Sequence, residues 1–157
     1  MRTLFIILTS AILFLACEEN KETPDSVFPK DTEIVVGSVG GWCYGSDSLV
    51  IINNNLSYYA YAPCEHKTYH RDSTISDTDL QNIYSDLNMN DFRSININTF
   101  NTCVDGVDFW IRITDADGTH TIRYGYQDSA VIEAVYNFAE KVHQIRENLH
   151  AVVWQSN

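Results

Sequence analysis

Residues 107–126 read VDFWIRITDADGTHTIRYGY, two runs of alternating apolar and polar residues around an Asp-rich turn. Alternation with a period of two indicates half-buried strands, because successive side chains of a strand point to opposite faces of the sheet. A turn of two or four residues puts every apolar side chain on one face, whereas a three-residue turn would mix them with Arg123 and Thr121. We therefore expect an antiparallel hairpin with one buried face, formed by Phe109, Ile111, Ile113, Ile122, Tyr124 and Tyr126.

The opposite face of this hairpin carries Trp110, Arg112 and Arg123. A two-residue turn places Arg112 across from Arg123, and a four-residue turn places Trp110 there instead, where a cation–π contact becomes available. Tryptophan and arginine are frequent anchors of protein interfaces, so these three residues form a candidate interaction patch for an anionic or aromatic ligand or a partner protein. The simpler alternative is a solvated face whose arginines are neutralised by acidic neighbours.

The remaining elements follow from the same kind of pattern. Residues 33–39 are rich in β-branched residues and predict a strand, and residues 48–62 predict a hairpin around three asparagines. Residues 76–87 predict a helix with Ser76 as its N-cap, and residues 129–149 predict a long helix with one apolar stripe. The alternation at residues 95–98 suggests a short edge strand. Together these elements predict a two-layer α+β domain, with an antiparallel sheet of about five strands and two helices on one face.

The chain begins with a secretory signal. Residues 4–17 are almost entirely apolar behind the single basic residue Arg2, and they are too few to cross a bilayer as a permanent helix. Residues 14–17, FLAC, resemble the lipobox of bacterial lipoproteins, which implies cleavage before Cys17 and a diacylglycerol on its thiol. We expect a signal peptide at residues 1–16, a flexible tether at 17–32 and one globular domain at 33–157.

Two further features resemble small lipoproteins of the Bacteroidota type. Glu18 and Glu19 are similar to the acidic run that follows the lipidated cysteine of surface-exposed members. Gly41, Cys43 and Gly45 form a Gly-x-Cys-x-Gly motif similar to that of uncharacterised domains in such proteins. The resemblance implies an outer-membrane lipoprotein on either the periplasmic face or the cell surface, and it implies no activity.

Composition excludes some partners and cofactors. The net charge of −11 repels phosphate backbones, so we expect no nucleic-acid partner. Residues 64–72 contain one cysteine, two histidines and two carboxylates, but their spacing fits no recurrent metal site and two basic residues lie among them. Asp115 and Asp117 begin a calcium-like run that lacks the later ligands, so an Asp-Gly turn is the better interpretation. We predict no metal and no other cofactor.

Cys43, Cys64 and Cys103 remain once Cys17 carries lipid, and an exported protein can form one bridge among them. Sequence alone leaves the pairing open. If the first hairpin turns at Asn54–Asn55, Cys64 lies within two residues of Cys43 across the sheet, which favours a Cys43–Cys64 disulfide with Cys103 free and buried.

The sequence contains neither a Gly-x-Ser-x-Gly nucleophile elbow nor a His-Glu-x-x-His metal motif. The first hypothesis is therefore a non-catalytic, membrane-anchored binding or interaction module. Its acidity leaves a second hypothesis, an inhibitor of a cationic, lysozyme-like enzyme that attacks the envelope. A small hydrolase is the third, because active sites assemble from residues far apart in the chain.

Overall fold

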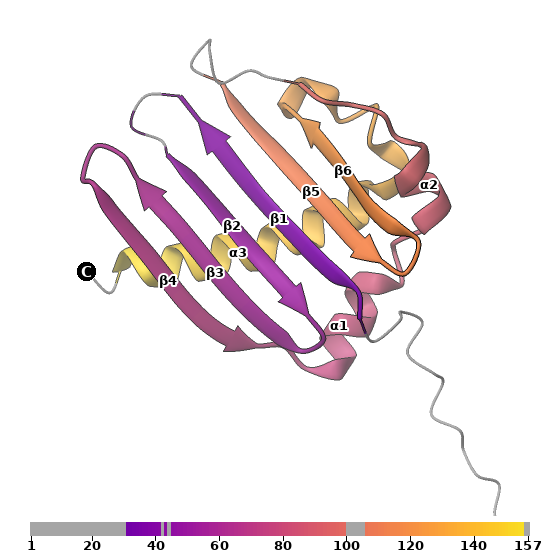
Figure 1. The fold of residues 1–157 in the computed structure, drawn as a ribbon, viewed down its shortest axis with the longest axis horizontal. Helices are drawn as coiled ribbons and strands as arrows, with labels where there is room; N and C mark the ends of the chain where they lie inside the picture. Colours follow the sequence, from indigo (N-terminus) through magenta and orange to yellow (C-terminus); the bar gives the residue numbers. More distant parts are fainter. Residues whose placement is uncertain (1–30, 42, 44, 100–105, 156–157) are drawn as a thin grey trace, which may run out of the picture.

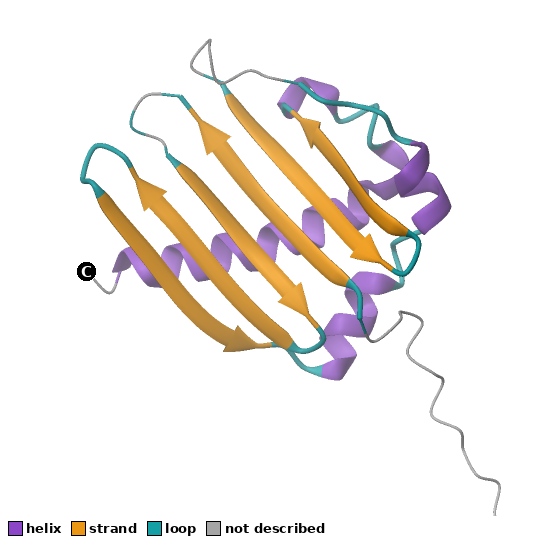
Figure 2. Ribbon diagram, in the orientation of Figure 1, coloured by secondary structure: helices purple, strands orange, loops and turns teal. Residues whose placement is uncertain are grey.

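The computed structural model describes residues 31–41, 43, 45–99 and 106–155. These residues form a two-layer α+β arrangement, in which an antiparallel sheet packs against helices on one face (Figures 1 and 2). The predicted fold class is confirmed. The predicted counts are wrong by one each, since the sheet has six strands and the described residues include three α-helices.

The strands lie in the order β4-β3-β2-β1-β5-β6, and every neighbouring pair is antiparallel. The first four follow one another as a meander, and β5 then returns to the other side of β1. Their bounds are β1 Glu33–Gly40, β2 Ser46–Ile52, β3 Asn55–Ala62, β4 Lys67–Thr74, β5 Val107–Asp115 and β6 Gly118–Tyr124.

The strand missed by the sequence prediction is β4, at one edge of the sheet. Its sequence, KTYHRDST, has no apolar alternation, and only Tyr69 and Ser73 are even partly buried. Natural sheets often place polar and charged residues on edge strands, because these discourage pairing with another chain. A strand solvated on both faces leaves no period-two signal in the sequence.

The first hairpin turns one residue earlier than predicted. Ile52 pairs with Asn55, so Asn53 and Asn54 form the turn, and Asn53 adopts a positive φ of 51°. Asparagine tolerates this conformation better than most residues. The register moves by two residues relative to a turn at Asn54–Asn55, and a shift of two leaves every side chain on its expected face.

The second hairpin has the register predicted for the four-residue loop. Trp110 pairs with Arg123, and Asp115 pairs with Gly118, so Ala116 and Asp117 form a two-residue turn. A pair between Arg112 and Arg123 would have needed this turn one residue later, at residues 117–118. The predicted apolar face is buried from Phe109 to Tyr124, and it faces the helices. Tyr126 is the exception: it lies beyond β6 and is 76% exposed.

The helix α1, Asp77–Tyr84, begins as predicted, and the Oγ of Ser76 accepts a hydrogen bond from the Asp79 backbone N–H at 3.1 Å, but the helix ends three residues before the predicted end at Leu87. The short helix α2, Met89–Ser94, was not predicted and is capped by the side chain of Asn88. The predicted edge strand at residues 95–98 is wrong. This segment contributes a single parallel bridge, between Asn98 and Arg123.

The long helix α3, Tyr136–Gln155, begins seven residues later than predicted and extends past the predicted end. The 3-10 turn η3, Glu133–Val135, lies in the first part of the predicted helix, and a second turn, η2 Tyr126–Asp128, lies just before its predicted start. The helix then crosses the whole sheet on one side (Figure 1).

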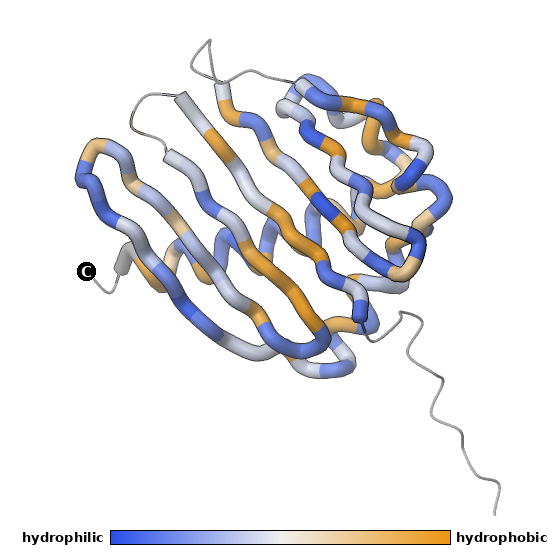
Figure 3. Tube along the Cα trace, viewed as in Figure 1, coloured by the Kyte–Doolittle hydropathy of each residue, from blue (hydrophilic) through white to orange (hydrophobic). Residues whose placement is uncertain are grey.

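Hydrophobic residues recur along the central strands β1, β2 and β5 (Figure 3). Their covered faces meet α3 in one continuous core. Its fully buried members include Ile34, Val36, Leu49, Ile51, Ile111, Ile113, Phe138 and Val142.

Candidate functional site

A groove of about 580 Å³ lies on the helix side of the sheet, between the β5–β6 hairpin and the first half of α3. Aromatic side chains line much of it: Phe109, Tyr124, Tyr126 and Tyr136. This volume falls within the range of small-molecule binding sites, which are typically about 300–1,000 Å³.

The sheet side of the groove depends on a tight change of chain direction after β6. Tyr124 is the last residue of β6 and pairs with Phe109. The backbone N–H of Gly125 then donates to the Asp128 carboxylate at 2.7 Å, which closes the η2 turn. This turn brings Tyr126 back over the end of the hairpin. Its ring contacts the Phe109 ring edge-on there, with 4.9 Å between the two ring centres.

The helix side of the groove is one stripe of α3. Its members recur three and four residues apart, so they project from the same side of the helix. They are Tyr136, Ala139, Glu140, His143, Gln144 and Glu147. The apolar stripe of α3 faces the core, and these mostly polar residues lie beside it.

His143 and Tyr124 meet at the inner wall of the groove. The Tyr124 hydroxyl lies 2.8 Å from His143 Nε2. Burial, reinforced by the nearby Arg146 guanidinium, lowers the pKa of His143 to about 3, and burial raises the pKa of Tyr124. Both side chains are therefore neutral around pH 7. His143 Nδ1 is buried and has no hydrogen-bond partner among the described residues.

Next to the groove, a buried carboxylate ties α3 to the sheet. Asp47 accepts hydrogen bonds from the Ser38 N–H at 3.0 Å, the Ser38 hydroxyl at 2.6 Å and the Tyr58 hydroxyl at 3.1 Å. The Arg146 guanidinium donates to the same carboxylate at 2.9 Å, and His150 Nδ1 lies 2.7 Å from the Tyr58 hydroxyl. These donors satisfy the buried carboxylate and fix its position, and we interpret the cluster as structural.

The sequence contains a signal for this cluster that the prediction missed. Arg146 follows Ala139 by seven residues and Val142 by four, so it occupies a position of the apolar stripe. It is 3% exposed, whereas Ile145, which was assigned to the stripe, is only partly buried. A charged residue at a core position requires a buried partner, and that requirement points to a carboxylate on the sheet.

The predicted interaction patch lies on the open face of the sheet. Trp110 lies over Gly37 of β1, where an added Cβ would come within 2.6 Å of the indole ring. The Arg112 guanidinium lies 6.0 Å from the centre of that ring. Arg112 also pairs with Glu33 at 3.5 Å, and Arg123 pairs with Asp108 at 2.8 Å. Both arginines therefore have acidic partners, as the simpler alternative expected.

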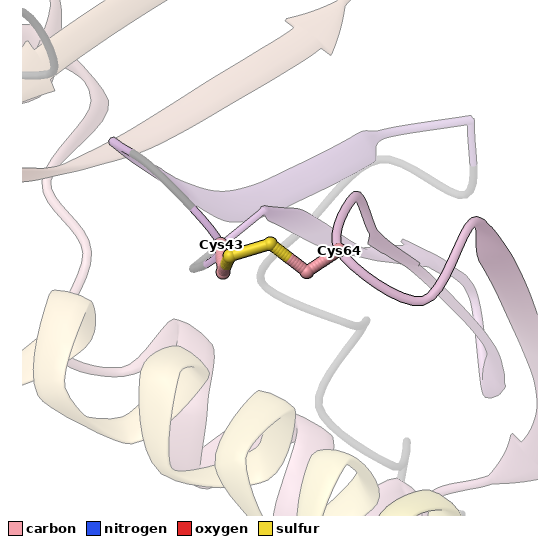
Figure 4. Close-up of a disulfide and its surroundings, with 2 residues drawn as sticks. All are labelled: Cys43 and Cys64. Atoms are coloured by element: carbon pink, nitrogen blue, oxygen red, sulfur yellow. A yellow bond between two sulfur atoms is a disulfide. The ribbon is translucent and has the colours of Figure 1, made fainter.

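Cys43, in the loop between β1 and β2, and Cys64, in the turn between β3 and β4, lie at disulfide distance (Figure 4). Their Cα atoms are 5.1 Å apart, and the pair is the one predicted from the sequence. Cys17 and Cys103 lie outside the described residues, and so does the predicted signal peptide.

Within the described residues, no helix is both long and apolar enough to cross a membrane, and no group of three or more His, Cys, Asp and Glu side chains could hold a metal ion. Comparison with known proteins gives no family assignment: no protein-family model matches the chain, and no curated protein matches it.

Proposed function

We propose that this protein is a non-catalytic binding module of the bacterial cell envelope, anchored by lipid on Cys17, that holds a small ligand in the groove between α3 and the β5–β6 hairpin. The observation that carries the proposal is the groove itself, whose aromatic and polar side chains converge on a volume of about 580 Å³. A largely preformed concave site with a few polar groups is the usual form of a ligand site.

Two ionisable groups at the inner wall of the groove, His143 and Tyr124, fit a binding role better than a catalytic one. General acid–base catalysis works best when a group has a pKa near the working pH. Burial moves the pKa values of His143 and Tyr124 far from neutrality, in the directions that keep both groups uncharged. They are suited to shaping and lining a site, and poorly suited to exchanging protons with a substrate.

The envelope location rests on the sequence of residues 4–17 and on the cysteine pair. Disulfides persist in exported proteins and are rare in the reducing cytoplasm, so the separation of Cys43 and Cys64 fits export. The test is Cys17→Ser, which we expect to leave the protein uncleaved or soluble. Stable anchoring needs more than one acyl chain. Intact-mass analysis showing no lipid on Cys17 of the membrane-extracted wild type would overturn the location.

Ligand binding in the groove is tested by filling it. Gln144 is an exposed residue of the groove wall and donates a hydrogen bond to Asn148, one turn further along α3. Gln144→Trp fills the groove, whereas Asn148→Trp loses the same hydrogen bond outside the groove lining. The pair is therefore matched in size and in the lost contact.

We expect native mass spectrometry of the full-length protein, recovered from an envelope extract, to show a bound small molecule. Gln144→Trp should abolish that mass, and Asn148→Trp should retain it. If the wild type carries no added mass, or if both variants carry it equally, the groove is not the ligand site.

A second candidate, a partner protein on the open face, is favoured by the exposed aromatic side chains there. Tyr59 and Tyr61 are 46% and 42% exposed, and they share this face with Trp110. The paired arginines make the face nearly neutral, so the partner surface is expected to be flat and uncharged. A folded Trp110→Ala/Tyr59→Ala variant should lose at least tenfold in affinity for a purified partner, whereas Val131→Ala, on the helix side, should not. Equal affinities would exclude the open face.

A further inference from the structure

We infer that the groove selects an organic cation, a primary ammonium or guanidinium group carried on an apolar stem. The inference rests on the proposed function, since it assigns a chemical class to the ligand of the same groove. It follows from the charges that line the groove, the partners of the nearby cations and the exposure of two tyrosine rings.

The groove presents two carboxylates that lack a strong cationic partner. Glu140 Oε1 accepts a hydrogen bond from the Tyr136 hydroxyl at 2.7 Å, and that donor is neutral. Glu147 is 61% exposed and lies 3.5 Å from Arg146. Arg146 has a shorter contact with Asp47, at 2.9 Å, and it does not line the groove.

The cation that lines the groove is already paired elsewhere. The Lys141 ammonium lies 2.6 Å from the Asp86 carboxylate and 2.6 Å from the Asn82 carbonyl oxygen, both beyond the groove lining at the end of α1. His143 contributes no positive charge at neutral pH. The charge of the groove is therefore negative, and a cationic ligand would complement it.

Aromatic rings supply the second half of the recognition. Tyr126 is 76% exposed and Tyr136 is 40% exposed, and both line the groove. The face of a tyrosine ring attracts a cation through its quadrupole, and the apolar stem of the ligand can pack against the same rings. Phe109, in edge-on contact with Tyr126, fixes the position of that ring.

The test compares three probes of the same shape by equilibrium dialysis with the full-length protein: phenethylammonium, neutral 2-phenylethanol and anionic phenylacetate. We expect the ammonium to bind roughly three- to tenfold more tightly than the alcohol, and the acetate to bind most weakly. A fourth probe, N-acetyl-lysinamide, separates a free amine from a lysine side chain of a partner protein. Tighter binding of either cation than of the neutral alcohol supports the inference, and the relative affinity of the two cations identifies the source.

Two double variants locate the charge effect. Glu140→Gln/Glu147→Gln should remove the preference for ammonium over alcohol. Glu65→Gln/Asp72→Asn makes the same change in net charge near the opposite edge of the sheet and should leave the preference intact. Gln144→Trp should block every probe, and thermal unfolding verifies that each variant is folded.

Equal binding of ammonium and alcohol in the wild type would overturn the cation inference and leave the groove as a ligand site. Equal loss of the preference in both double variants would overturn it too, because the effect would then reflect net charge alone. Failure of all four probes would also reject the inference, while the extract experiment with Gln144→Trp would judge the proposed function independently.

Discussion

Each face of the sheet contains an ion pair between an arginine and a carboxylate, and one of these pairs is buried while the other is exposed. On the helix side, the Arg146 and Asp47 side chains are 4% and 9% exposed, and their charged atoms lie 2.9 Å apart. On the open side, the Arg112 and Glu33 side chains are 44% and 35% exposed and lie 3.5 Å apart. The buried pair has lost its water and depends on its partners, whereas the exposed pair keeps much of its hydration.

The comparison separates contacts that stabilise the fold from contacts that contribute little to its stability. Asp47 connects β2 with α3, two elements that are far apart in the sequence, and Ser38 and Tyr58 complete its hydrogen bonds. Glu33 and Arg112 connect neighbouring strands that the sheet already joins. We therefore expect the covered face to contribute more to stability, and the exposed positions of the open face, such as Glu33 and Arg112, to tolerate substitution.

The largest effect is expected from breaking the buried pair. Asp47→Ala or Arg146→Met should each destabilise the protein by about 3–5 kcal/mol, because each leaves a buried charge without its partner. The double variant should lose less than the sum of the two, since they share one interaction. Urea unfolding measures all three, and a single-variant loss below about 1 kcal/mol would erase the difference between the faces.

The cysteine pair provides a reference that belongs to neither face. Cys43 and Cys64 are 21 residues apart in sequence, and a bridge closing a loop of that size stabilises by about 3 kcal/mol in the chain-entropy model. Cys43→Ser/Cys64→Ser should lose about that amount in urea unfolding. The wild type should lose the same under reducing conditions, and a reductant that leaves its stability unchanged would show that the pair is not bridged.

A pH titration sharpens the comparison, because it probes a buried group of the covered face. Burial lowers the folded-state pKa of His143 from 6.5 to about 3. As the pH falls below about 6.5, the unfolded chain takes up a proton that the folded protein does not, so stability is lost between these pKa values. The slope contributed by one such group is at most about 1.4 kcal/mol per pH unit.

His143→Gln should flatten this slope. Burial also lowers the pKa of His150, so part of the slope should remain in this variant. Urea unfolding at several pH values between 4 and 8 gives the measurement. Identical slopes in the wild type and His143→Gln would mean that His143 takes up its proton in the folded protein as readily as in the unfolded chain.

The smallest effect is expected on the open face. Glu33→Gln and Arg112→Gln should each change stability by less than about 1 kcal/mol, because exposed ion pairs are weakened by hydration and side-chain entropy. A higher salt concentration screens exposed charges, so it should reduce the stability lost by these two variants further. A loss as large as that of Asp47→Ala would show that this pair is as important as the buried one.

Much of the fold could be predicted because burial on one face imposes a period on the sequence. The second hairpin and the capped start of helix α1 have strong local signals, and both formed as expected. The edge strand β4 and the short helix α2 carry few apolar residues, so no such period marks them. The Gly125–Asp128 hydrogen bond that closes η2 and the second turn η3 precede α3, and helical periodicity reveals neither of these local features.

The groove could not be predicted from the sequence, for a different reason. It joins the end of one hairpin to a stripe of α3, and this contact depends on where the 3-10 turns place the helix. Arg146 is the residue that could have revealed the neighbouring cluster, because it interrupts an apolar stripe. The open-face positions of Trp110, Arg112 and Arg123 were predicted from alternation alone.

The position of β1 has a mechanical consequence for an anchored protein. β1 is the first strand of the described chain and lies in the middle of the sheet, bonded to β2 on one side and to β5 on the other. A pull along the chain from Cys17 would load both ladders in shear, so many hydrogen bonds would have to break together. An anchor attached to an edge strand such as β4 would strain one ladder only. Under the proposed anchoring at Cys17, the load would enter the domain through β1, a strand bonded on both sides.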